Sequence, residues 1–447
     1  MRHRRAVSTL VAVGAAVAGL AAPVTTTPAA ATPAVARAAL APGHIDHVFV
    51  VDIENEGYAA TYGPSSPATY LNHTLRRDGL LIEHYYAIGH VSLDNYLAQV
   101  SGQAPNHDTQ LDCIGKNFIP VTPGTDDPAP AKNPGQVDGN GCVYPAPTGH
   151  SHGAPTIADQ LDAKYPPNRR THVASWRAYV EDMGNDPARD GGVADPTGGT
   201  DCAHPALGAV DDAEVAVPGD QYVLRHDPFV HFASIIDQPA LCDANVVPMG
   251  TLRANGKPSP TGHLAADLRR VATTPRFAFL VPNVCDDGHD ATCVGTNDAG
   301  GHQGGLVGAD LWLRHWMPTI MASPAYRDGS LLVVITADEA DVDPADPAFA
   351  AACCHEQPGP NTAAPGNFSG TATTDTEPGG GQVGALLLDA RYVRHGVVDT
   401  TGYYNHYSAL RSYEDLLGLT TGGTDGHGHL GFAAARGLRP FGRDVFD

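Results

Sequence analysis

The chain has 447 residues, of which 42% are hydrophobic, and its 27 basic and 49 acidic side chains give a formal net charge of −22 at pH 7. This acidic balance argues against nucleic acid or an anionic membrane as a general surface partner. The length would allow two domains, although large α/β enzymes often carry as many residues in one domain with long insertions.

Residues 1–37 have the layout of a secretory signal peptide followed by a leader. A basic start precedes an apolar run of small residues, and Thr, Pro and Ala then continue to about Ala38. A membrane anchor is the alternative, but the apolar run is short and no basic stop-transfer cluster follows it. No later segment has the run of about 18 apolar residues that spans a bilayer. We therefore expect a secreted protein whose mature part, residues 38–447, forms one domain without an integral membrane segment.

Four apolar runs in the chain are typical of buried strands, at residues 44–57, 276–290, 329–341 and 382–389. Helical patterns are interspersed with them, at residues 154–165, 262–272, 308–323 and 406–419. Together these patterns predict an α/β fold with a central, mostly parallel sheet and helices on both faces. Gly-, Pro- and Asp-rich pieces predict long loop insertions, at residues 104–155, 184–221, 286–308 and 341–382.

The cysteines are even in number, which predicts disulfides in an exported chain. Spacing leaves their connectivity open, although a local loop between Cys285 and Cys293 is compatible with it. No pair has the C-x-x-C spacing of a structural zinc site, which disfavours that alternative. The eight residues are Cys113, Cys142, Cys202, Cys242, Cys285, Cys293, Cys353 and Cys354.

Polar side chains follow two of the predicted strands directly. Glu54 and Asn55 end the first run, and Asp338 and Glu339 end the third. In α/β sheets functional groups collect at the carboxyl ends of the strands, so these side chains could meet at one edge. Hard oxygen ligands of this kind suit Mg, Ca, Mn or Zn. The alternative is that acidic residues at strand ends merely face solvent.

The segment HVSLDNYLAQVSG places Ser92 at the start of a helical pattern. Unpaired backbone N–H groups and the helix dipole favour a bound phosphate there. Coordination to a metal would lower the pKa of the serine hydroxyl and make it a nucleophile. Asn95, three residues on, could donate to a phosphoryl oxygen. The alternative is that Ser92 only caps its helix.

Three of the 22 histidines lie beside these groups in the sequence, namely His90, His289 and His406. They could ligate a metal, hold a phosphate or protonate a leaving alkoxide. A histidine that supplies this proton predicts activity favoured at mildly acidic pH. An exposed loop histidine without a catalytic role is the alternative.

Eight motifs in a fixed order strongly resemble the bacterial phosphoesterase family, which contains secreted acid phosphatases and related phospholipases C. The fold of that family is similar to the alkaline phosphatase superfamily. The resemblance covers about residues 45–433. The motifs are I-E-N, S-L-D-N-Y-L-A-Q-V-S-G, S-W-R-A-Y-V-E-D-M, R-H-D-P-F-V-H-F, V-P-N-V-C-D-D-G-H-D, G-A-D-L-W-L, I-T-A-D-E and Y-N-H-Y-S-A-L-R-S-Y-E-D-L-L-G-L.

The resemblance implies a metal-dependent phosphoesterase site with Ser92 as the attacking group and a phosphoserine intermediate. It implies that Asn95 steadies the phosphoryl oxygens and that His289 and His406 face the phosphate or the leaving group; His90 is a weaker match. The implied metal ligands are Glu54, Asn55, Ser92, Asp338 and Glu339. The expected substrate is a small phosphomonoester, which includes a phosphoinositide headgroup.

Some residues of these motifs depart from the family pattern or carry no assigned chemistry. Family members commonly have proline where Val91 and Asp94 stand and an aromatic residue where Ala337 stands. Asp94 matters most, because a carboxylate beside an incoming phosphate is repulsive unless it is paired or turned away. The remaining motif residues are expected to build the fold: Trp176, Tyr179, Glu181, Arg225, His226 and Asp227.

Two other functions remain open. Phospholipase C-like cleavage of phosphodiesters would need an apolar, aromatic-rimmed groove, and aromatic residues make up 7% of the chain without an evident cluster. A non-catalytic secreted binding protein with the same fold would have no need of Ser92, Asp338 and Glu339.

Overall fold

The computed structural model describes residues 38–447 with several gaps. The expected signal peptide and leader, residues 1–37, lie outside the described residues, as do parts of the expected insertions. The gaps comprise residues 116, 123–133, 148–152, 167–173, 212, 214, 253–258, 260, 290–291, 298–300, 342–348, 350, 355 and 361–378.

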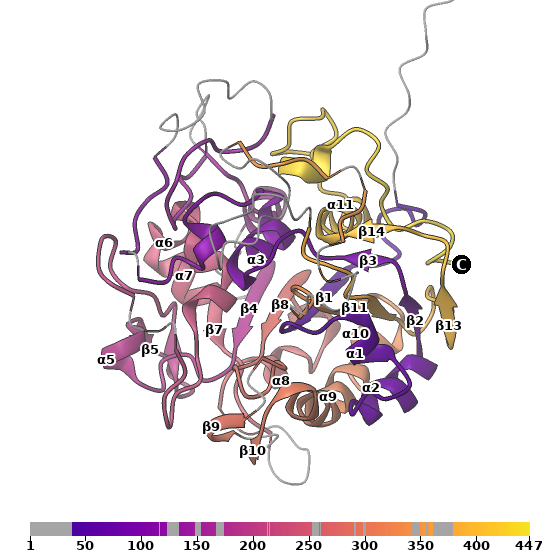
Figure 1. The fold of residues 1–447 in the computed structure, drawn as a ribbon, viewed down its shortest axis with the longest axis horizontal. Coiled ribbons are helices and arrows are strands. Elements are labelled where there is room, and N and C mark those ends of the chain that lie inside the picture. The colour runs from indigo at the N-terminus through magenta and orange to yellow at the C-terminus, as the bar shows by residue number, and fades with distance from the viewer. Residues whose placement is uncertain are drawn as a thin grey trace, which may run out of the picture. The chain divides into compact units, whose positions relative to one another are not determined.

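An eight-stranded sheet forms the centre of the molecule, in the order β13-β2-β12-β11-β1-β8-β4-β7 (Figure 1). Strand β12 pairs antiparallel with both of its neighbours, and the other pairs are parallel. The strands are β1 (His47–Ile53), β2 (Gly79–Ile82), β4 (Trp176–Val180), β7 (Val246–Pro248), β8 (Phe277–Val281), β11 (Leu331–Ala337), β12 (Ala385–Leu388) and β13 (Val397–Asp399).

In the described part of the chain, three two-stranded sheets lie outside the central one. They consist of β3 (Tyr85–Tyr86) with β14 (Tyr404–Asn405), β5 (Val193–Ala194) with β6 (Thr200–Asp201), and β9 (Thr292–Asn297) with β10 (Gly301–Gln303).

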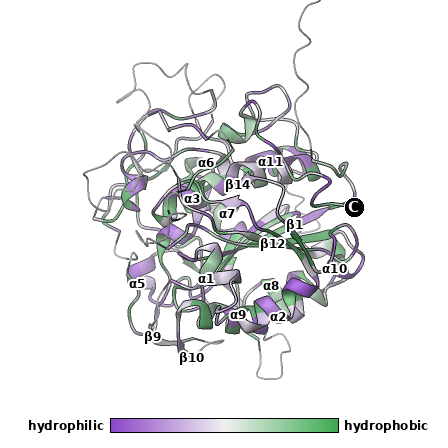
Figure 2. Cartoon of the chain, turned by 45° about the vertical axis from the view of Figure 1, so that its right-hand side comes forward, coloured by the Kyte–Doolittle hydropathy of each residue, from purple (hydrophilic) through white to green (hydrophobic). Residues whose placement is uncertain are grey.

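The central strands are apolar because helices cover both faces of the sheet. Every residue of β1, β8 and β11 is buried, as expected for parallel strands packed on both sides. In Figure 1, α3 and α11 lie on one side of the sheet and α2 and α9 on the other. Figure 2 shows the hydrophobic residues concentrated in the central strands and hydrophilic ones on the peripheral α5. The expected α/β architecture with a mostly parallel sheet is therefore confirmed.

Most of the helices are short. The predicted helical patterns at 154–165, 308–323 and 406–419 correspond to α4, α9 and α11, whereas residues 262–272 form only α8 and a 3₁₀ turn at Val271–Thr273. The helices are α1 (Tyr58–Tyr62), α2 (Thr69–His73), α3 (Ser92–Ser101), α4 (Ile157–Lys164), α5 (Pro187–Asp190), α6 (Ala233–Ile236), α7 (Pro239–Asn245), α8 (Leu264–Asp267), α9 (Gly305–Met321), α10 (Pro324–Arg327) and α11 (His406–Leu416). No helix among the described residues is long and apolar enough to cross a membrane.

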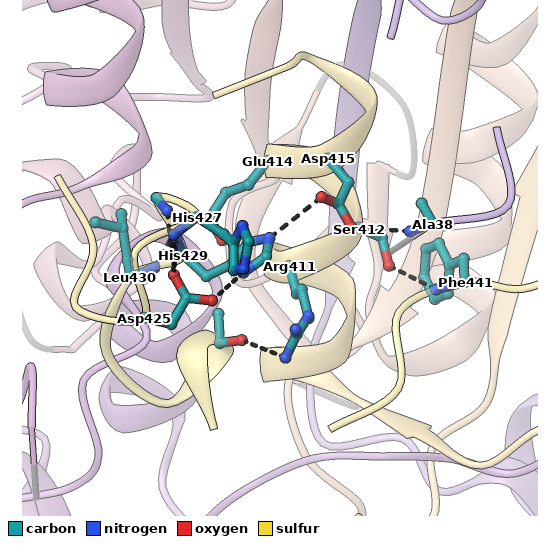
Figure 3. A network of polar contacts seen from close by, with 12 residues as sticks. Ala38, Arg411, Ser412, Glu414, Asp415, Asp425, His427, His429, Leu430 and Phe441 are labelled. Atoms are coloured by element: carbon teal, nitrogen blue, oxygen red, sulfur yellow. Dashed lines mark hydrogen bonds and ion pairs between the residues drawn. The ribbon is translucent and has the colours of Figure 1, made fainter. Parts of the chain in front are cut away.

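A buried polar network ties the C-terminal segment and residue 38 to α11 (Figure 3). His429, which is fully buried, contacts Asp425 Oδ2 through Nδ1 at 2.6 Å and Asp415 Oδ1 through Nε2 at 3.2 Å. The backbone N–H of Ala38 donates to the other Asp415 oxygen at 2.8 Å. These contacts fix the position of α11, whose first residue is His406.

All eight cysteines are paired, which confirms the expected disulfides and the local Cys285–Cys293 loop. The other pairs are Cys113–Cys142, Cys202–Cys242 and Cys353–Cys354, with sequence separations of 29, 40 and 1.

Replacing Cys113 and Cys142 by alanine should lower the free energy of unfolding by about 2–4 kcal/mol, because the unfolded chain gains the entropy of a long open loop. The Cys353→Ala/Cys354→Ala variant is the matched control, since a bridge between adjacent residues closes almost no loop. Denaturant titration under non-reducing conditions measures both. Equal losses in the two variants would contradict the entropic explanation.

Candidate active site

The carboxyl ends of three adjacent strands bring the acidic residues together. Ile53 at the end of β1 pairs with Ala337 at the end of β11, so the next residues, Glu54 and Asp338, emerge side by side. The backbone N–H of Asn55 donates to Asp338 Oδ1 at 3.0 Å, and that of Glu54 donates to the carbonyl of Asp287, beyond β8, at 2.9 Å. One sheet edge therefore collects carboxylates from β1, β8 and β11.

Ser92 lies at the start of α3 and points at this edge. Its Oγ donates to Glu54 Oε2 at 2.8 Å, and the hydroxyl of Tyr96, one turn further on, donates to Glu54 Oε1. The cap of the helix is supplied elsewhere, because Asp112 Oδ1 accepts from the N–H of Leu93 at 2.8 Å. The Ser92 hydroxyl is thus directed at a carboxylate and does not cap its helix.

The backbone is strained immediately before Ser92. Val91 has φ 139°, a region that a β-branched residue rarely adopts. Its N–H donates to Glu339 Oε2 at 3.1 Å, and its carbonyl accepts from Asn95 Nδ2 at 3.0 Å. Residues held in such conformations cluster at functional sites.

The side chain of Asn95 is occupied by the loop that precedes Ser92. Its Oδ1 accepts from the N–H groups of Ile88 and Gly89 at 2.9 and 3.1 Å, and its Nδ2 donates to the carbonyls of Gly89 and Val91 at 2.8 and 3.0 Å. Both amide hydrogens are used in the loop, so neither remains for a phosphoryl oxygen. The geometry differs here from the expected phosphate contact, and we propose that Asn95 positions the loop.

His226, which the sequence predicted to build the fold only, lies in the site. Its Nε2 is 3.3 Å from Glu54 Oε2 and its Nδ1 is 3.3 Å from Asp287 Oδ2, and its ring stacks on Tyr96 with centroids 5.2 Å apart. Donor atoms of Glu54, His226 and Asp287 all lie within 4.8 Å of one another. The R-H-D-P-F motif was the only sequence signal for this residue, and the motif does not reveal which strand end it faces.

The geometry around His226 fits a metal ion. Neither ring nitrogen makes a hydrogen bond within the described part of the chain. Burial lowers the pKa of His226 well below its usual value, so the ring is neutral and has one N–H. At least one nitrogen lone pair therefore faces a carboxylate oxygen, an arrangement that is favourable when a cation lies between them.

The expected oxygen ligands fit a metal ion as well. Asp338 Oδ2 and Asn55 Oδ1 are buried and have no hydrogen-bond partner among the described residues. Burial raises the pKa values of Glu54, Asp338 and Glu339, because loss of solvent disfavours their charged forms, and neighbouring carboxylates add to the rise for Asp338 and Glu339. A divalent cation would favour the charged forms.

The three histidines of the sequence prediction occupy different environments. His90 Nδ1 contacts Glu339 Oε2 at 2.8 Å, so it orients that carboxylate.

His406 is fully buried. Its Nε2 donates to the carbonyl of Asp338 at 2.7 Å, so Nδ1 is the atom that accepts from the Tyr85 hydroxyl at 3.1 Å. Burial lowers the pKa of His406 to about 4, so it is not a proton donor at mildly acidic pH. The expectation that His406 faces the leaving group therefore does not fit the geometry, and we propose a positioning role.

His289 lies at the solvent-exposed side of the site. Its ring centroid is 6.4 Å from that of His226, and its backbone N–H donates to Asp287 Oδ1 at 2.8 Å. Its charge, like that of Arg225, counteracts the rise in the pKa of Glu54. Of the three predicted histidines it is the exposed one.

Asp94 is buried against the loop that precedes Ser92. Its side chain is 1% exposed, and its carboxylate packs so closely under Gly89 that a Cβ at that glycine would lie 2.6 Å from both oxygens. Burial raises the pKa of Asp94 well above its usual value. This direction favours the uncharged carboxyl, which weakens the expected repulsion of phosphate.

Comparison with known proteins finds similarity only to solved structures. No protein-family model and no curated protein matches the chain. A protein of the alkaline phosphatase superfamily from Vibrio parahaemolyticus is 12% identical, with a TM-score of 0.38, over 86% of this chain and 69% of the other. Ps i-CgsB is 14% identical, with a TM-score of 0.39, over 90% and 78%. The PsFucS1 sulfatase from Pseudoalteromonas sp. is 13% identical, with a TM-score of 0.38, over 84% and 68%.

Replacing Asn95 by alanine should lower the free energy of unfolding by about 1–3 kcal/mol, because the buried N–H groups of Ile88 and Gly89 lose their acceptor. The control is Asn245→Ala in α7, where a buried amide makes one hydrogen bond, to the carbonyl of Leu241. Thermal unfolding of both variants measures the difference. A loss for Asn95→Ala no larger than the control would argue against the positioning role.

Proposed function

We propose that this chain is a secreted, metal-dependent hydrolase of phosphoric esters that attacks phosphorus with Ser92, prefers phosphomonoesters and is favoured by mildly acidic pH. The hydrogen bond of 2.8 Å from Ser92 Oγ to Glu54 Oε2 carries the proposal. Four disulfides are compatible with an extracellular location.

Glu54 and α3 activate and orient the nucleophile in this proposal. Glu54 Oε2 is within reach of the Ser92 proton, and the positive end of the helix dipole lies at Ser92, where it favours a phosphate dianion. A bound divalent ion would supply further positive charge for the serine oxygen and the phosphoryl oxygens. Its proposed ligands are Glu54, Asn55, Ser92, Asp338 and Glu339, as expected from the sequence, together with His226 and Asp287.

The ligand chemistry restricts the metal. Carboxylate and amide oxygens suit Mg, Ca, Mn and Zn, and an imidazole nitrogen favours Zn or Mn within that group. His90 and His406 would hold the ligating loop in place from outside, through Glu339 and the carbonyl of Asp338.

The reaction proceeds by two displacements. Ser92 Oγ gives its proton to Glu54 and bonds to phosphorus while the bond from phosphorus to the alcohol oxygen breaks, and His289 supplies the proton that the departing oxygen takes. Water then attacks the phosphoserine from the vacated side and gives a proton to His289; Glu54 returns its proton to the Ser92 oxygen, and phosphate is released.

One observation favours a phosphate carried on a lipid as a second candidate substrate. Leu111 and Ile114 are 41% and 51% exposed, and they lie on either side of Asp112, which caps the helix of Ser92. We propose that these two exposed apolar side chains rest on a membrane surface while a phosphoinositide or phospholipid headgroup enters the site.

Ser92→Ala should abolish hydrolysis of 4-nitrophenyl phosphate, with a loss in kcat of about 10³-fold or more, because no other group replaces the nucleophile. Ser101→Ala, at the far end of the same helix, is the matched control and should keep the wild-type rate. Chelator should abolish the wild-type rate, and added Zn²⁺ or Mn²⁺ should restore it. Hydrolysis of bis(4-nitrophenyl) phosphate alone would indicate a phosphodiesterase, and no hydrolysis of either ester with any metal would favour a binding protein.

His289→Asn should slow hydrolysis of an alkyl phosphate by about 10²-fold or more, because an alkoxide needs a proton to leave. The loss with 4-nitrophenyl phosphate should be much smaller, since nitrophenolate leaves without one. The wild-type rate with the alkyl ester should fall as pH rises through the range in which imidazole loses its proton. His44→Asn, near the opposite end of β1, serves as control. Equal losses with both esters would exclude His289 as the acid.

A further inference from the structure

A second group of metal-ligating side chains lies at the edge strand β7, away from Ser92. Asp195, Asp201 and His263 each offer one donor atom, and these atoms all lie within 4.8 Å of one another. His263 Nε2 is 2.8 Å from Asp195 Oδ2. The first two come from the β5–β6 hairpin and the third from the residue before α8, so the cluster joins two loops that are separate in the chain.

The edge of the central sheet holds both loops. The N–H of Cys202, beside β6, donates to the carbonyl of Val246 at 2.9 Å, and that of His263 donates to the carbonyl of Pro248 at 3.1 Å. Both acceptors belong to β7, and Figure 1 shows β5 on the β7 side of the sheet. The Cys202–Cys242 disulfide anchors the hairpin a second time.

The hairpin turn orients the carboxylates of Asp195 and Asp201. Asp195 Oδ1 accepts from the backbone N–H of Thr197 at 2.6 Å, which leaves Oδ2 directed at His263. The turn requires glycine at positions 198 and 199, where φ is 98° and 91°. It returns the chain so that Asp201 reaches the same side as Asp195.

Both carboxylates of this cluster are buried, and one of their oxygens has no hydrogen-bond partner among the described residues. Asp195 and Asp201 are 8% and 6% exposed, and Asp201 Oδ1 is buried without a hydrogen-bond partner. Burial and the neighbouring Asp195 raise the pKa of Asp201 to about 7. The His263 side chain is 23% exposed, which leaves the cluster accessible from solvent.

We propose that Asp195, Asp201 and His263 bind a divalent transition-metal ion, Zn²⁺ or Mn²⁺, which ties the β5–β6 hairpin to the loop before α8. An imidazole nitrogen beside two carboxylate oxygens suits these ions, whereas Ca²⁺ takes oxygen ligands. The ion is structural and separate from the ion proposed beside Ser92. The competing explanation is a single proton shared between the two carboxylates.

Metal binding by the chelator-stripped full chain tests the proposal. The Glu54→Gln/Asp287→Asn background weakens the first site, and calorimetric titration with Zn²⁺, Mn²⁺ or Ca²⁺ then reports on the second. We expect this background to bind one Zn²⁺ or Mn²⁺ and to melt at a higher temperature with the ion present. Loss of a residue that only supports a metal ligand costs roughly 10–100-fold in metal affinity. Asp201→Asn removes a direct ligand, so adding it to this background should weaken binding by more than that.

Two further variants keep the test decisive. His263→Gln removes a partly exposed ligand with little risk to folding and should weaken binding as Asp201→Asn does. Asp186→Asn changes an exposed carboxylate near the same hairpin and should leave binding unchanged. No bound ion in the background chain, binding of Ca²⁺ alone, or equal affinity after Asp201→Asn would overturn the proposal. If the Asp201→Asn chain has a higher melting temperature and an unchanged metal content, the carboxylates of Asp195 and Asp201 share a proton and bind no ion.

Discussion

The candidate active site depends on the parallel register of β1 between β8 and β11. Because neighbouring parallel strands end at the same level, the residues after Ile53 and Ala337 emerge together, and the backbone of Asp287 beyond β8 joins them. This register concentrates buried carboxylates at one edge of the sheet. Buried carboxylates without compensating charge are unfavourable, so the same geometry that builds the site also creates its demand for a cation.

The loop before Ser92 shows how that site is kept rigid. Val91 adopts a backbone conformation that costs of order 1–3 kcal/mol. It persists because hydrogen bonds from surrounding groups hold the backbone on both sides. Glu339 binds its N–H, and Asn95 binds its carbonyl together with the backbone of Ile88 and Gly89. Glu339 therefore joins the strained loop to the proposed metal ligands, so a shift of that carboxylate should also disturb the loop before Ser92.

Environment separates histidines that look equivalent in the sequence. His406 is neutral and donates to a carbonyl, His90 orients a carboxylate, and His289 stays exposed. His226 is neutral between two carboxylates, which is the state in which imidazole binds metals. The acidic chain thus places imidazoles next to the carboxylates of both clusters, and His263 beside Asp195 repeats that arrangement at β7.

The apolar runs of β1, β8, β11 and β12 predicted four of the eight strands of the central sheet, because burial on both faces leaves a continuous signal in consecutive residues. The strands β2, β4, β7 and β13 were not predicted. The motifs pointed to Glu54, Ser92, Asp338 and Glu339, since each follows directly from a strand or begins a helix. Three properties became visible only in the tertiary structure. His226 lies beside Glu54, the side-chain amide of Asn95 is hydrogen-bonded to the loop before Ser92, and burial keeps His406 neutral. These properties depend on distances and solvent exclusion among segments far apart in the chain, which neighbouring residues do not encode.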